Sequence, residues 1–83
     1  MRESAPMTSQ SELRRAFENV AGHLANLELV QSLVEEALAE SFALDKSIHF
    51  LRERTQEADV TVQTDIRILI NEIEHLRREK SSL

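Results

Sequence analysis

The chain has 83 residues and contains no cysteine, no tryptophan and no tyrosine, with one glycine and one proline. Without cysteine it can form neither disulfides nor thiolate metal sites. The many turns of a β protein draw on glycine, proline and asparagine, so this composition argues against a sheet. The N-terminus lacks the apolar core of a signal peptide, and no apolar run is long enough to span a bilayer. We therefore expect a cytoplasmic protein with no membrane partner.

The net charge of −5 is unevenly distributed along the chain. Residues 1–44 hold three basic and seven acidic residues, whereas residues 45–83 hold seven basic and eight acidic residues. An acidic surface repels phosphate backbones, which makes nucleic acid an unlikely partner.

Two apolar stripes at helical spacing occupy most of the chain. The first consists of Leu13, Ala16, Phe17, Val20, Leu24, Leu27, Val34 and Leu38. The second consists of Leu44, Ile48, Leu51, Ala58, Val62, Ile66, Leu69, Ile73 and Leu76. This pattern predicts an all-α fold: a single antiparallel helical hairpin over residues 9–81 that assembles into a four-helix bundle. Residues 1–8 show no periodicity and are expected to form a flexible tail.

The start of the first helix has a clear sequence signal, whereas its end is marked only by a cluster of possible cap residues. Ser9 and Glu12 have the spacing of a capping box, so the first helix is expected over about residues 10–41. Three residues that often cap helices, Ser41, Asp45 and Ser47, then cluster before the second stripe. They favour a hairpin turn at residues 41–47 over one unbroken helix.

The second helix is expected over about residues 46–80. Residues 59–64 are rich in β-branched side chains, which have poor helix propensity. A kink there, or a break giving a third helix from about Thr61, is the alternative to the continuous helix that we expect.

The apolar arc of the first helix widens after Asn26, which indicates that this half contacts two neighbours. We therefore expect a partner surface here and on the second helix. The predicted interface residues are Leu27, Val30, Leu33, Val34, Ala37, Leu38, Ile66, Leu69 and Ile73. His23 and Gln31 fall on the same apolar side, where single polar residues can fix register and partner choice.

Signatures of catalysis or of metal binding are absent from the sequence. Glu72 and His75 have the spacing of a di-iron ligand pair, but both lie off the apolar stripe, whereas bundle ligands point inward. No phosphate-binding loop or nucleophile motif occurs. We expect no enzyme activity, no cofactor, no metal and no small-molecule substrate. Gly22 either allows the close approach of a crossing helix or is simply tolerated.

These features predict a small helical protein–protein interaction module: an adaptor, a chaperone-like protein or a regulatory subunit. It would act by homodimerisation or by burying its apolar faces against a helical partner. The alternative is a dimeric nucleic-acid-associated regulator that uses a local basic edge. That edge would comprise Arg14, Arg15, Arg77, Arg78 and Lys80.

Overall fold

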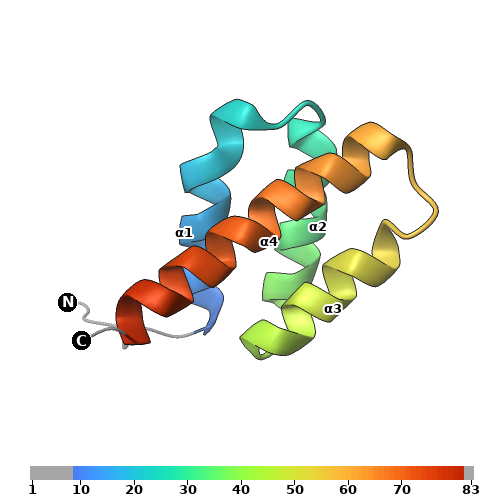
Figure 1. Cartoon of the computed structure of the whole chain (residues 1–83). Helices are drawn as coiled ribbons and strands as arrows, with labels where there is room; N and C mark the ends of the chain where they lie inside the picture. The colour runs from blue at the N-terminus through green and yellow to red at the C-terminus, as the bar shows by residue number, and fades with distance from the viewer. Residues whose placement is uncertain (1–8, 82–83) are drawn as a thin grey trace.

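The computed structural model describes the backbone of residues 9–81 and the side chains of residues 12–79. Its elements are α1 (Ser9–Val20), the 3-10 helix η1 (Ala21–His23), α2 (Leu27–Ala39), α3 (Leu44–Arg54) and α4 (Val60–Ser81). The α1–α2 pair and the α3–α4 pair each run antiparallel, and α4 crosses in front of α1 and α2 (Figure 1). The predicted all-helical fold is confirmed for this part of the chain. The prediction of two long helices was wrong, because each of them is divided into shorter helices. The tail expected at residues 1–8 lies outside the described residues.

The first predicted helix is broken in the middle. The α-helix ends at Val20, continues as one 3-10 turn, and gives way to extended backbone at Leu24. Gly22 lies in this turn and is a poor helix former. A single helix over residues 10–41 was therefore wrong. Ser9 is the first helical residue of α1, and its side chain lies outside those described, so its capping role stays a prediction.

A buried carboxylate on α4 holds this break in place. Asp65 is only 2% exposed. Its two oxygens accept hydrogen bonds from the backbone N–H of Ala25 (3.0 Å), the backbone N–H of Asn26 (2.7 Å) and the Asn26 side-chain amide (3.1 Å). Backbone donors next to a helix N-terminus have no carbonyl partner within the helix, and a carboxylate both satisfies them and complements the helix dipole. The bend between α1 and α2 therefore depends on a residue about forty positions further along the chain.

The second connection lies where the cap-type residues cluster. α2 ends at Ala39, and Ser41 adopts a left-handed conformation with φ 57°, which ends the helix. None of the three candidate caps occupies the cap position of α3, which is Ala43. Asp45 instead accepts a hydrogen bond from Arg77 Nη1 at 2.8 Å, and Ser47 is buried.

A third connection divides the second predicted helix. α3 ends at Arg54, and the Thr55 hydroxyl donates a hydrogen bond to the Leu51 carbonyl at 2.8 Å, a contact that competes with helix continuation. α4 then starts at Val60, so the β-branched run forms its first turns. The continuous helix was wrong, and the break considered as its alternative is present.

The interior draws on all four α-helices. Its largest fully buried side chains are Leu13, Val30, Leu51, Leu69 and Ile73. α2 contacts α1, α3 and α4, so the wide apolar arc of this segment has several neighbours within one chain. Within residues 9–81, no helix combines the length and the apolar character needed to cross a membrane.

Two aromatic rings cover the core near the α2–α3 connection. The rings of Phe42 and Phe50 lie 5.5 Å apart and are tilted by 57°. Lys46 lies over the first ring and Arg54 over the second, at 5.1 and 5.2 Å from the ring centres. Such contacts stabilise exposed sites by roughly 0.5–1 kcal/mol each. Arg54 also contacts Glu36, which joins α3 to α2.

Replacing Gly22 with alanine is expected to raise the free energy of unfolding by about 0.4–1 kcal/mol. No positive φ requires a glycine here, and an added Cβ would meet no atom within 4 Å. Alanine then gains stability by restricting the unfolded chain. The same geometry excludes the close approach of a crossing helix as the reason for this glycine. Thermal unfolding of Gly22→Ala beside Ala21→Gly, which should lose stability, checks the sign.

Candidate binding groove

The predicted interface residues lie mainly in the interior. Seven of the nine are 5% exposed or less: Val30, Leu33, Val34, Ala37, Ile66, Leu69 and Ile73. Leu38 is partly buried, and Leu27 is 41% exposed. The breaks between the helices allow the chain to cover these faces itself, so the surface expected around Val30, Leu33 and Ala37 is part of the core.

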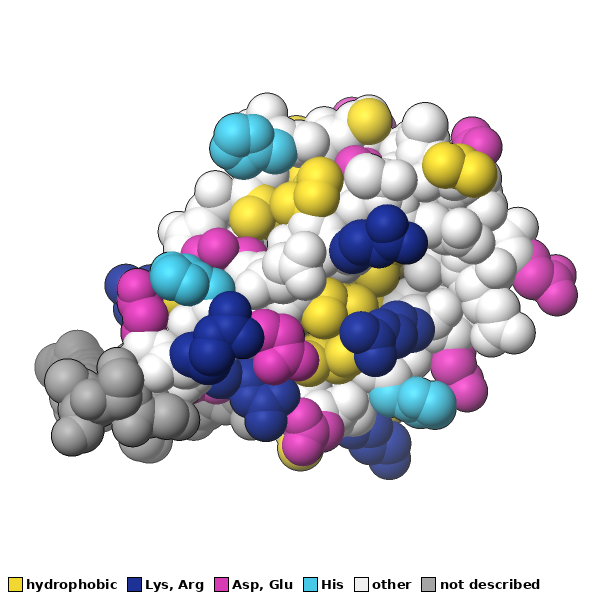
Figure 2. Space-filling model, viewed as in Figure 1, with side chains coloured by type: hydrophobic (Ala, Val, Ile, Leu, Met, Phe, Trp, Pro, Cys, Tyr) yellow, Lys and Arg dark blue, Asp and Glu magenta, His cyan; other side chains and the backbone are white. Residues whose placement is uncertain are grey.

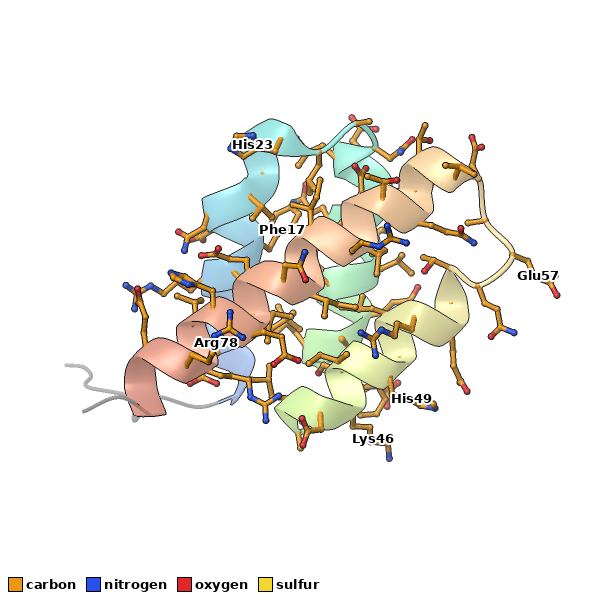
Figure 3. All side chains as sticks on the ribbon, in the orientation of Figure 1. Phe17, His23, Lys46, His49, Glu57 and Arg78 are labelled. Atoms are coloured by element: carbon orange, nitrogen blue, oxygen red, sulfur yellow. The ribbon has the colours of Figure 1, made fainter. Side chains whose placement is uncertain are left out.

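His23 and Gln31 do not lie at a buried seam. His23 is exposed at the end of η1 (Figure 3), and Gln31 is exposed on α2, where its amide contacts Glu35 Oε2 at 3.3 Å. The break after Val20 places His23 in the 3-10 turn and changes the phase of α2, so that Gln31 lies away from the buried side of that helix.

Glu72 and His75 belong to surface contacts. Glu72 accepts a hydrogen bond from the Asn19 side-chain amide at 2.8 Å, which ties α4 to α1. His75 lies 3.0 Å from Glu79, one turn further along α4. Among the residues that the structure describes, no three histidine or acidic side chains are grouped so that they could hold a metal ion.

The predicted basic edge is only partly assembled. The start of α1 and the end of α4 lie at the same end of the molecule (Figure 1). Arg14, Arg15 and Arg78 are exposed there, but Arg77 is engaged by Asp45. The side chain of Lys80 lies outside those described.

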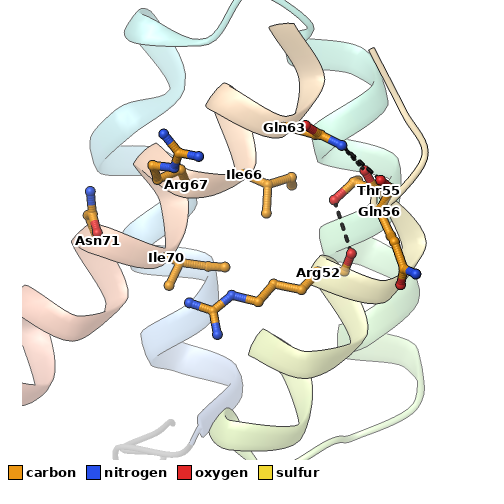
Figure 4. A pocket seen from close by; sticks show the side chains of 8 residues that line it. All are labelled: Arg52, Thr55, Gln56, Gln63, Ile66, Arg67, Ile70 and Asn71. Atoms are coloured by element: carbon orange, nitrogen blue, oxygen red, sulfur yellow. Dashed lines mark hydrogen bonds between the residues drawn. The ribbon is translucent and has the colours of Figure 1, made fainter. Parts of the chain in front are cut away.

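A groove between α3 and α4 forms a concave surface with a volume of about 230 Å³. Ile66 and Ile70 lie between the two arginines Arg52 and Arg67, which form opposite sides of the groove (Figure 4). The remaining lining residues are Thr55, Gln56, Gln63 and Asn71. The volume is below the roughly 300–1,000 Å³ of typical small-molecule sites, so the groove suits one or two protruding side chains.

One glutamine fixes the end of this groove. The Gln63 side chain donates hydrogen bonds to the backbone carbonyls of Thr55 (3.2 Å) and Gln56 (2.9 Å). These bonds join the start of α4 to the end of α3, which sets the spacing of the two helices at that point. The groove is therefore held by the fold rather than by a mobile loop.

The electrostatic character of the groove comes from its two arginines. Arg52 and Arg67 are exposed, and neither has an acidic partner within the described part of the chain. By contrast, Arg54 contacts Glu36 and Arg77 contacts Asp45. Figure 2 shows dark blue side chains on both sides of an apolar strip over α3 and α4. Guanidinium groups bind carboxylates and phosphates through paired hydrogen bonds, so the groove can hold an anionic group.

Sequence reasoning did not identify Arg52, Arg67 or Asp65 as important. The two arginines lie on different helices, and only the break at residues 55–59 brings those helices side by side. Asp65 had one usable signal, since it is a charged residue next to Ile66 in the second apolar stripe.

We compared the chain with family models, curated proteins and solved structures, and none of them matches it.

Proposed function

We propose that this chain is a small non-enzymatic protein–protein interaction module and that the α3–α4 groove is its docking surface. The observation that carries the proposal is the pair of arginines, Arg52 and Arg67, on either side of a preformed groove, neither of which has an acidic partner among the described residues. Charged groups of one sign beside a concave surface steer a complementary partner and select against the wrong one. The partner is a second copy of the chain or another helical protein.

A protein partner suits this groove better than nucleic acid. Phosphate contacts alone would need a basic surface, whereas the whole chain carries a net charge of −5. Glu74 on α4 and Glu53 on α3 add acidic groups to the helices that form the groove. A dimeric regulator that binds nucleic acid is the alternative proposal, and cross-linking distinguishes it from a protein-binding module by the chemical nature of the adduct.

Photo-cross-linking in cells tests the proposal. A photoreactive phenylalanine analogue replaces Asn71 at the groove or, as a control, Glu18 on the exposed side of α1. We expect a protein adduct of defined mass from position 71, its loss when Arg52→Glu and Arg67→Glu are added, and no such adduct from position 18. An adduct with nucleic acid would support the alternative regulator, and the absence of any adduct would contradict the proposal.

A further inference from the structure

We infer that the occupant of the α3–α4 groove is a second copy of this chain, bound through the outer face of α2. The inference rests on the proposed function, because it takes the groove to be a docking surface. It adds the identity of the partner and the segment that the partner presents.

The outer face of α2 is acidic and free of basic residues. Residues 27–40 contain four glutamates and no lysine or arginine. Glu28 and Glu35 are both exposed, on the side of the helix opposite the buried Val30, Val34 and Ala37. The negative charge of this helix face is therefore complementary to the positive charge of the groove.

The spacing on α2 allows a close approach. Glu28 and Glu35 are seven residues apart, which places them on one line about 10.5 Å apart along the helix. Gln31, Ser32 and Ala39 lie near the same line, and the Gln31 amide donates a hydrogen bond to Glu35 at 3.3 Å, so only polar or small side chains adjoin the two glutamates there. A helix of this profile can bring both carboxylates to a narrow groove flanked by Arg52 and Arg67.

The size and charge of the groove favour a protruding carboxylate side chain over a bulky apolar one. Ile66 and Ile70 are nearly buried at 3% and 4% exposure, so the groove offers little free apolar surface. Its affinity must come mainly from the two arginines, Arg52 and Arg67. Ion pairs of this kind give specificity and fast association more than tight binding.

The two surfaces point in opposite directions. The buried side of α2 faces α1, α3 and α4, so its acidic side points away from them, whereas the groove opens on the face of the α3–α4 pair that is seen in Figure 2. A contact between different surfaces of identical chains is head-to-tail, and it yields rings or open chains rather than a two-fold dimer. Association should therefore proceed beyond two copies.

Sedimentation velocity at low salt tests this inference with three purified variants and the wild type. We expect the wild type to associate as its concentration rises and to dissociate as salt screens the charges between 20 and 500 mM, concentrations at which the screening length falls from roughly 20 to 4 Å. Arg52→Glu with Arg67→Glu should reduce association by about tenfold or more. Glu28→Lys with Glu35→Lys should do the same. Mixing these two variants should restore association, because each supplies the charge that the other lacks.

The third variant separates the specific contact from a general charge effect. Arg14→Glu with Arg15→Glu changes the net charge as much as the reversal in the groove does, but on α1, and it should associate like the wild type. The lysine variant lowers the overall negative charge, so a general effect would strengthen its association, whereas the inference predicts a loss. Circular dichroism checks that every variant keeps its helices.

Two outcomes would overturn the inference. One is a wild type that stays monomeric at low salt and high concentration. The other is equal weakening by the α1 variant. If either occurs while position 71 still cross-links to a different protein, the groove remains a docking site and only the identity of its partner is wrong. If position 71 also gives no adduct, the proposed function fails with it.

Discussion

Asp65→Ala is expected to lower the free energy of unfolding by about 3 kcal/mol. The change removes the acceptor of three hydrogen bonds, from the backbone of Ala25 and from both the backbone and the side chain of Asn26. Hydrogen bonds to a charged group contribute roughly 1.5–3 kcal/mol, and donors left without a partner add a further penalty. For a domain of this size such a loss corresponds to a fall in Tm of roughly 12–24 °C. Thermal and urea unfolding followed by circular dichroism measure it.

Two further variants sharpen this experiment. Asp65→Asn keeps the size of the side chain but removes its charge and one acceptor, so its loss should lie between those of the wild type and the alanine variant. Glu57→Ala removes an exposed carboxylate from the α3–α4 connection and should change stability by less than about 0.5 kcal/mol. Equal unfolding free energies for Asp65→Ala and Glu57→Ala would show that the buried carboxylate does not hold the bend.

Leu33→Glu is expected to unfold the protein. Leu33 is 5% exposed and lies in the core. The substitution removes buried apolar surface and places a carboxylate in a site without a partner, at a cost of about 4 kcal/mol or more. A domain of about 80 residues has a total stability of roughly 4–12 kcal/mol, so most of it would be lost. Circular dichroism should show the helical signal falling at 25–37 °C.

Leu29→Glu provides the matched control for this second prediction. It makes the same chemical change one turn away on the same helix, but Leu29 is 46% exposed. Its stability should stay within about 0.5 kcal/mol of the wild type. A Leu33→Glu protein that remains fully helical and loses only its ability to associate would show instead that Leu33 belongs to an interface between chains.

The sequence predicted the all-helical character of the chain and most of the core, though not the division into helices, because apolar spacing is a local property. Leu13, Leu51 and Ile73 belong to the two stripes and are fully buried. The breaks were harder to predict, because a single glycine at position 22 is tolerated in many helices. What bends the chain there is Asp65, and a contact over forty positions leaves no periodic signal.

The widening after Asn26 correctly indicated more than one neighbour for this segment, but most of the wide apolar face is covered within one chain. It predicted two neighbours for this segment, and α2 indeed contacts several helices. Those neighbours belong to the same chain, because α3 and α4 fold back over α2 once the second stripe is broken. Periodicity shows how wide an apolar face is, but not which chain covers it.

The groove could not be predicted from the stripes at all. Arg52 and Arg67 are separated by fifteen positions and, in the continuous helix that we expected, would have faced solvent far apart. The turn that follows Thr55 brings their helices together. A site composed of side chains from two helices becomes visible only when the position of the turn between them is known.

The dependence of the α1–α2 bend on Asp65 also bears on the order in which the protein is made. Synthesis produces the acidic, apolar α2 segment well before the carboxylate that fixes its geometry, and α1 packs against α4, which is made after α2 and α3. Contacts between distant parts of a chain slow folding and prolong the exposure of apolar surface. The α1–α2 segment is thus open to aggregation and to capture by chaperones until α4 has been made.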